Sequence, residues 1–173
     1  ISTSFKIIIN LKVLNIHKRV INQSKNKIEK ILNTLSSEND LIWPKEKWPA
    51  MKFKGGIKAG AKGGHGPISY FVEKYKPNEI IQFRFLKPNN GIHMFEIKEL
   101  NNKKTEIKHT IDMNTTGKGT LMWTLVIRPL HNALIQDAFD KLENNFSKTP
   151  KLTKWNFWVR FLRIQFQKNN PKP

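Results

Sequence analysis

Alternation of apolar and polar residues dominates this chain and predicts a series of β-strands. In residues 79–86, for example, Ile81, Phe83 and Phe85 share one face. A period of two is typical of half-buried strands. The same pattern, together with local enrichment in β-branched and aromatic residues, predicts strands at residues 13–21, 67–76, 79–86, 92–100, 104–113 and 120–128.

Two segments show the period of a helix instead. Residues 25–35 place Ile28, Ile31 and Leu35 on one face, and from Pro129 apolar residues recur every three or four positions as far as Phe146. Proline suits the first turn of a helix, where its missing N–H costs nothing. The order of elements predicts an α+β domain with a curved antiparallel sheet wrapped on the C-terminal helix.

The alternation places two histidines on the inner face of the sheet. His93 and His109 share their parity with apolar neighbours, while charged residues take the other positions. A plain two-residue turn at Asn101–Asn102 would contradict this parity, so we expect a longer loop or a β-bulge there. His93 would then lie opposite or diagonal to His109.

Two buried imidazoles in an aromatic layer predict an apolar cavity with a few polar anchors, which is the usual form of a small-molecule site. Buried imidazoles are costly unless they are hydrogen-bonded. The alternative is that both histidines are core residues bonded to each other, to a backbone carbonyl or to water. The predicted ligand-binding residues are Tyr70, Phe83, Phe85, His93, Phe95, His109, Ile111, Trp123 and Leu134.

Metal and cofactor chemistry have little support in the sequence. The absence of cysteine excludes disulfides and thiolate chemistry. A metal site would need a third ligand near His93 and His109, and His17, His65 and His131 are distant along the chain. We therefore expect no metal and no cofactor, and we interpret His131 as a hydrogen-bonding residue at a strand–helix junction.

The net charge of +18 arises mainly from lysines scattered among asparagine and isoleucine. Such a pattern is typical of a solvated surface, and without a nucleic-acid-binding motif we do not expect a nucleic acid partner. No run of eighteen apolar residues is present to span a membrane. We expect a cytoplasmic monomer or homodimer, with residues 1–12 a disordered or spurious extension, 13–147 the domain and 148–173 a tail.

The tail has a composition of its own. Residues 149–167 contain no acidic residue and many aromatic ones. They predict a short basic helix that docks on an anionic membrane surface or a partner protein. Its predicted contact residues are Trp155, Trp158, Arg160 and Arg163. The alternative, which we favour because an isolated aromatic helix would be prone to aggregate, is a helix folded back on its own domain, with its arginines in water.

Several motifs resemble the START-like SRPBCC superfamily, which includes polyketide-cyclase-like, lipid-transfer and birch-pollen-allergen-like proteins. The resemblance covers residues 13–166 and extends to a poorly characterised bacterial branch of the superfamily. The motifs that carry it are GGHGPISY (63–70), GIHMFEI (91–97), HTIDM (109–113), the WTLVIRPLHNAL run (123–134), the WPKEKWP loop and KWNFWVRFLR (154–163). It implies a helix-grip fold: a curved antiparallel β-sheet around a long C-terminal α-helix, with two short helices after the first strand and a hydrophobic cavity inside. It implies no particular reaction.

Three functions follow as hypotheses. The first is binding of a small hydrophobic or lipid-like ligand in the internal cavity, with transport of that ligand as an extension of the same hypothesis. The alternative is an enzyme of the cyclase or dehydratase type, with His93 or His109 as general acid or base. The third is a basic surface that binds nucleic acid or an anionic membrane.

Overall fold

Seven strands form one antiparallel sheet in the computed structural model, which describes residues 10–169. Their order is β1-β7-β6-β5-β4-β3-β2. The strands are β1 (Asn10–Ile21), β2 (Met51–Phe53), β3 (Lys62–His65), β4 (Ile68–Lys76), β5 (Ile80–Phe85), β6 (Gly91–Asn101) and β7 (Lys104–Thr116). Five of the six expected strands are confirmed. Residues 10–12, expected in the N-terminal extension, belong to β1, and residues 1–9 lie outside the described part.

The β6–β7 hairpin has an irregular register, as we expected from the placement of His93 and His109 on the inner face. The pairing shifts by one residue between Glu99 and Asn101, which is a β-bulge. As a result His93 lies opposite Ile111, and His109 lies opposite Phe95. The two histidines are therefore diagonal neighbours on the inner face, as expected.

The strand expected at residues 120–128 is wrong, because this segment is helical. β7 ends at Thr116, and Gly117, with φ of +51°, turns the chain into a continuous helix made of α2 (Lys118–Met122), the π-helical turn η1 (Trp123–Ile127) and α3 (Arg128–Asn144). In a strand, Leu121 and Leu125 would share the inward face with Trp123. Of these, only Trp123 is buried, and the two leucines are exposed.

Pro129 explains the π-helical turn and a contact with the tail. Proline has no N–H, and its ring crowds the carbonyl four residues earlier, which here is that of Leu125. The wider π turn, which directly precedes the proline's turn, accommodates the ring. The Leu125 carbonyl, which lost its α-helical donor, accepts a hydrogen bond from the indole Nε1 of Trp158 at 2.7 Å.

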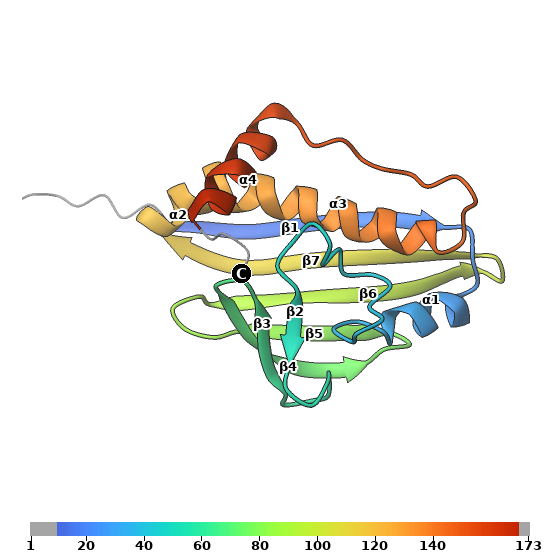
Figure 1. The fold of residues 1–173 in the computed structure, drawn as a ribbon. Helices are drawn as coiled ribbons and strands as arrows, with labels where there is room; N and C mark the ends of the chain where they lie inside the picture. Colours follow the sequence, from blue (N-terminus) through green and yellow to red (C-terminus); the bar gives the residue numbers. More distant parts are fainter. Residues whose placement is uncertain (1–9, 170–173) are drawn as a thin grey trace, which may run out of the picture.

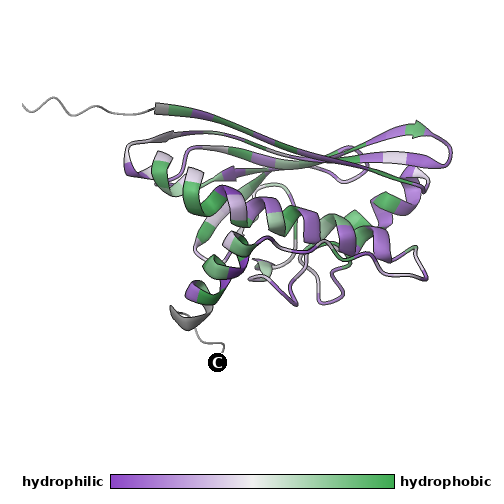
Figure 2. Ribbon diagram, turned by 90° about the horizontal axis from the view of Figure 1, so that it is seen from above, coloured by the Kyte–Doolittle hydropathy of each residue, from purple (hydrophilic) through white to green (hydrophobic). Residues whose placement is uncertain are grey.

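The elements form a helix-grip fold. The long helix crosses the inner face of the curved sheet, and α4 (Phe157–Asn169) lies on the outer side of α3, away from the sheet (Figures 1 and 2). The alternative in which the tail folds back on its domain is therefore the arrangement observed. Only one of the two short helices expected after the first strand is present in the described chain, α1 (Lys25–Leu32).

The segment expected to hold a second short helix forms an anchored loop instead. The Asp40 carboxylate accepts the backbone N–H groups of Ser36, Ile42 and Trp43, which fixes turns rather than a helix. Beyond it, Trp43 and Trp48 are almost fully buried in the main apolar cluster. The loop thus closes one side of the core.

Two glycines in the glycine-rich stretch allow β3 to approach its neighbours. A Cβ atom on Gly63 would lie 2.3 Å from the carbonyl oxygen of Lys52, and one on Gly64 would lie 2.1 Å from that of Ile68. Both distances are far below van der Waals contact. The glycines therefore serve strand packing.

Candidate functional site

All five histidines of the protein lie in one chain of ring contacts through the interior. The distances between ring centroids are 5.8 Å for His17–His131, 5.0 Å for His131–His109 and 5.7 Å for His109–His93. Tyr70 continues the chain, 4.6 Å from His93 and 5.6 Å from His65. The rings come from β1, α3, β7, β6, β4 and β3, so the sheet and the long helix together assemble the chain.

The three central histidines have ring nitrogens without a hydrogen-bonding partner among the described residues. These atoms are His93 Nε2, His109 Nδ1 and His131 Nδ1, and all three are buried. Burial is the main reason why the pKa of each of these histidines lies well below its usual value, and repulsion from the neighbouring imidazoles is the second reason. The three imidazoles are therefore neutral at pH 7, and each carries one donor and one acceptor nitrogen.

The two outer histidines are hydrogen-bonded. His17 Nε2 lies 3.0 Å from the side-chain oxygens of Asn15 and Asn132, so it carries the proton. Its Nδ1 then accepts from Gln136 Nε2 at 3.4 Å. At the other end, His65 Nδ1 lies 2.9 Å from the Tyr70 hydroxyl, and burial lowers the pKa of His65 to about 4.

The central histidines separate two apolar clusters of the core. The larger cluster contains Phe83 and Phe95, and the smaller one is formed by Val13, Ile111, Met113 and Trp123. His93 stacks on Phe83 at 4.7 Å, and His131 lies 6.3 Å from Trp123. A polar layer of imidazoles therefore lies between two apolar regions.

The structure brings the nine predicted ligand-binding residues to this interface. Tyr70, Phe83, Phe85, His93, Phe95 and His109 form a continuous group of ring contacts on the inner face of the sheet. Ile111 and Trp123 belong to the smaller cluster, and Leu134 faces the sheet from α3. Trp123 arrives there from a helix rather than from the expected strand.

Sequence reasoning missed His131 as a member of the site. It was interpreted as a junction residue, but its ring packs between His17 and His109. The signal was present, because His131 lies three and four residues before the buried Leu134 and Ile135 on the same helical stripe. Among the described residues, no group of three histidines or carboxylates is placed to hold a metal ion.

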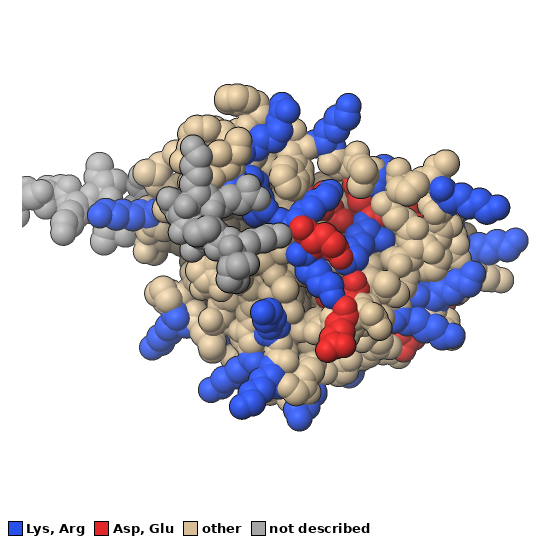
Figure 3. Space-filling view, viewed as in Figure 1, with Lys and Arg blue, Asp and Glu red and all other residues tan. Residues whose placement is uncertain are grey.

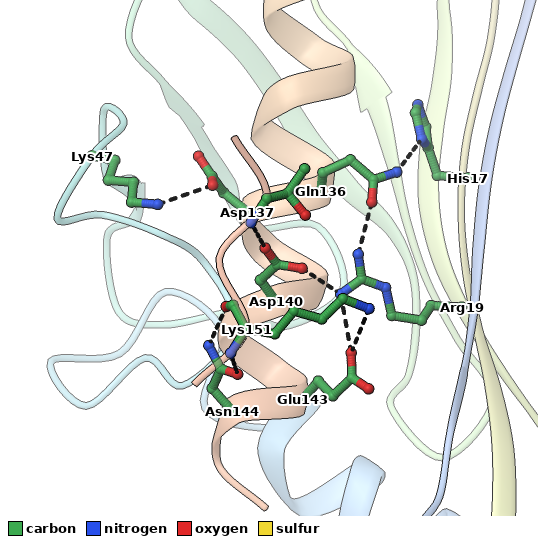
Figure 4. Close-up of polar contacts among 10 residues, drawn as sticks. His17, Arg19, Lys47, Gln136, Asp137, Asp140, Glu143, Asn144 and Lys151 are labelled. Carbon is green, nitrogen blue, oxygen red and sulfur yellow. Dashed lines mark hydrogen bonds and ion pairs between the residues drawn. The ribbon is translucent and has the colours of Figure 1, made fainter. Parts of the chain in front are cut away.

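A polar network on α3 connects the sheet to the rest of the molecule (Figure 4). Arg19 donates from Nη1 to Asp140 at 2.6 Å and to Glu143 at 3.2 Å, and from Nη2 to Gln136 at 2.7 Å. Gln136 in turn contacts His17. The outer end of the histidine chain is thus fixed by an ion-paired arginine.

Asp137 joins the tail to the anchored loop. Its buried carboxylate accepts the indole N–H groups of Trp48 at 2.7 Å and Trp155 at 2.9 Å, and it pairs with Lys47 at 3.0 Å. The guanidinium of Arg163 lies 4.5 Å from the Trp48 ring centroid. Three of the four predicted contact residues of the tail, Trp155, Trp158 and Arg163, therefore contact the domain. Arg163 is not in open water as the folded-back alternative assumed.

Two surface hollows lie near the two ends of the histidine chain. One, of about 450 Å³, lies between α3 and the segment before α4, and its lining includes Asn132 and Gln136, the partners of His17. The other, of about 420 Å³, is lined by the glycines of β3 and by His65. The chain of rings therefore extends from one hollow toward the other.

No family model and no curated protein sequence matches this chain. Solved structures do share its fold. Norcoclaurine synthase from Thalictrum flavum has a TM-score of 0.60 at 9% identity, covering 81% of this chain and 96% of that chain. A protein from Thermobifida fusca has a TM-score of 0.62 at 8% identity (83% and 99% covered), and a conserved protein of unknown function from Enterococcus faecalis has 0.57 at 12% (93% and 88% covered). These similarities show the helix-grip fold.

Proposed function

We propose that this protein binds a small, neutral, mainly apolar ligand between the sheet and the long helix, with His93, His109 and His131 hydrogen-bonding its polar group. The observation that carries the proposal is the set of three buried ring nitrogens without a partner among the described residues. They lie together on three different elements and between two apolar clusters.

The energetics favour a bound partner. A buried polar atom without a hydrogen bond costs about 1–3 kcal/mol. Three such atoms therefore cost several kcal/mol, a large part of the net stability of a typical domain. A ligand that supplies hydrogen bonds recovers this energy on binding and adds the contribution of its apolar surface.

The charge state of the site defines the class of ligand. Because the three imidazoles are neutral, they do not attract an anion as a cationic site would. They offer both donors and acceptors, which suits a hydroxyl, phenol or carbonyl group on an apolar body. One fold neighbour, norcoclaurine synthase, was solved in complex with dopamine and hydroxybenzaldehyde, both of which carry a phenolic hydroxyl on an aromatic ring.

A route to the histidines passes Phe85. This side chain is only half-buried, packs against both apolar clusters and stacks on His93 at 5.0 Å. The smaller cluster that it borders is covered by Trp123, the first residue of the π-helical turn. Such turns are irregular and often occur at functional sites. Movement of Phe85 would open a path between the two clusters to the central imidazoles.

The enzyme hypothesis is less well supported by the geometry. A general base works best with a pKa near the working pH, and burial shifts the pKa of all three central histidines away from it. No side-chain carboxylate hydrogen-bonds His93 or His109 among the described residues to orient either one. We therefore place binding ahead of cyclase or dehydratase chemistry.

A fluorescence titration with N-phenyl-1-naphthylamine, a neutral apolar probe with one N–H group, tests the proposal. We expect saturable binding to the wild-type protein and at least a tenfold weaker affinity for the His93→Phe/His109→Phe variant, with an unchanged circular dichroism spectrum. His17→Phe, at the hydrogen-bonded outer end of the chain, is the matched control and should bind as the wild type does. Equal affinity of all three proteins would contradict the proposal.

A further inference from the structure

The helix α4 presents an apolar face to solvent even though it packs on the domain. Val159 and Leu162 are buried against the domain, whereas Phe157, Phe161 and Ile164 on the opposite side are 75%, 41% and 50% exposed. A surface helix normally has the reverse distribution, with its outer face polar. The outer face of α4 is therefore unusual for a helix that only completes a core.

This face continues onto the beginning of the long helix. Trp158 stacks on Phe161 at 5.4 Å and donates its indole N–H to the carbonyl of Leu125. Leu125 and, one turn earlier, Leu121 are exposed as well. We define the apolar patch as Leu121, Leu125, Phe157, Trp158, Phe161 and Ile164.

The charges around the patch have one sign. Residues 113–136 and 144–169, which contain the whole patch, include no aspartate or glutamate. Lys118, Arg128, Lys154 and Arg160 from these segments are exposed. On the face drawn in Figure 3, most of the acidic side chains lie near the middle, among Lys and Arg side chains. Asp137, Asp140 and Glu143 lie on the later turns of α3 and have cationic partners of their own.

We propose that the apolar patch docks on the surface of an anionic lipid bilayer. Tryptophan and phenylalanine beside lysine and arginine are the combination that binds the membrane interface, where the rings enter the headgroup region and the cations remain at the lipid phosphates. No helix in the described part of the chain is both long and apolar enough to cross the bilayer. The patch would therefore lie on the membrane.

Charge decides between a bilayer and a second copy of the chain. A symmetric dimer through the patch would place two basic rims against each other, in a protein whose net charge is already +18. An anionic bilayer instead supplies the complementary charge. The inference does not depend on the proposed ligand, because the patch and the histidine chain share no residue.

Sedimentation of the full chain with vesicles tests this inference. The vesicles are phosphatidylcholine alone or phosphatidylcholine with 30% phosphatidylglycerol. We expect binding to the anionic vesicles that is weakened by 0.5 M salt, and a reduction of about tenfold or more in the partition coefficient for Phe161→Ser/Ile164→Ser. The matched control is Leu14→Thr/Ile16→Thr, which removes two similarly exposed apolar side chains from β1 and should bind as the wild type does.

The control separates docking by the patch from adsorption by net charge, since neither double variant changes the charge. Equal binding of the wild type and both variants would show adsorption by charge alone and would overturn the inference. Absence of binding to anionic vesicles would also overturn the inference. This holds whether or not sedimentation velocity shows a dimer that Phe161→Ser/Ile164→Ser abolishes. Arg160→Glu should weaken binding about tenfold, whereas Lys30→Glu on α1 should change it much less.

Discussion

Acidification between pH 7.5 and 5.5 should destabilise this protein strongly, because desolvation in the folded state lowers the pKa of four of its histidines. Burial lowers the pKa of His93, His109 and His131 well below the usual value and that of His65 to about 4. In the unfolded chain each has a pKa near 6.5. Below that pH the unfolded state binds more protons than the folded state, so stability falls as the pH falls.

The size of the effect follows from proton linkage. A histidine that stays neutral in the folded state and titrates at about 6.5 in the unfolded state costs about 1.4 kcal/mol at pH 5.5, and four cost about 6 kcal/mol. Domains have a total stability of about 5–15 kcal/mol. The Asp40 carboxyl, whose pKa is raised by burial, acts in the opposite direction at lower pH. We therefore expect the protein to be marginal or unfolded near pH 5.5.

Urea unfolding at pH 7.5, 6.5 and 5.5, followed by tryptophan fluorescence, measures this dependence. The His93→Leu/His109→Leu variant removes two of the four groups, so its loss between pH 7.5 and 5.5 should be about 3 kcal/mol instead of about 6. His17→Leu removes one group whose pKa is also lowered by burial, so it should reduce the pH dependence less than the double variant does. A free energy of unfolding that is flat over this range, or an equal slope in the wild type and the double variant, would refute the reasoning.

Two further predictions concern the attachment of the tail. Asp137→Ala leaves two indole N–H groups without their acceptor, so the free energy of unfolding should fall by about 3 kcal/mol. The control Asp112→Ala, at an exposed ion pair, should cost less than about 1 kcal/mol. Equal losses in denaturant unfolding would argue against this role of Asp137. Trp158→Phe should lower hydrogen-exchange protection in α4 by removing the donor to the Leu125 carbonyl. In a Pro129→Ala background, where that carbonyl regains a helical N–H, the same substitution should have a smaller effect, and an equal effect in both backgrounds would contradict the assignment.

The alternation of apolar and polar residues predicted five of the seven strands of the sheet but not the short strands β2 and β3. It identified five strands, the inward direction of His93 and His109, and the irregular hairpin that this direction requires. These features are local, because side-chain parity along a strand and the geometry of a turn depend on neighbouring residues. The resemblance to helix-grip proteins then supplied the arrangement of the sheet around the helix.

Residues 120–128 were predicted incorrectly because composition and tertiary context disagree there. Tryptophan, threonine, valine and isoleucine favour strands, but β7 already ends at Thr116 and Gly117 turns the chain. A buried strand would not leave apolar side chains exposed to solvent, as this helix does. Their outward direction becomes apparent only when α4 and the apolar patch are seen together.

The histidine chain could be predicted only in part. His93 and His109 share a hairpin, so their parity brings them together, whereas His17, His65 and His131 reach them through the pairing of β1 with β7, the position of β3 and the docking of α3. These contacts are between residues far apart in sequence. For His131 the helical stripe gave a usable signal, but for His17 and His65 no local pattern distinguishes a chain member from a surface residue.

Native mass spectrometry of the gently purified protein, followed by denaturing mass spectrometry of the same sample, tests the central claim most directly. The account predicts a small neutral molecule that co-purifies with the wild-type protein and with His17→Phe and is lost from His93→Phe/His109→Phe. A molecule retained equally by the double variant would contradict the claim that the central histidines hold the ligand.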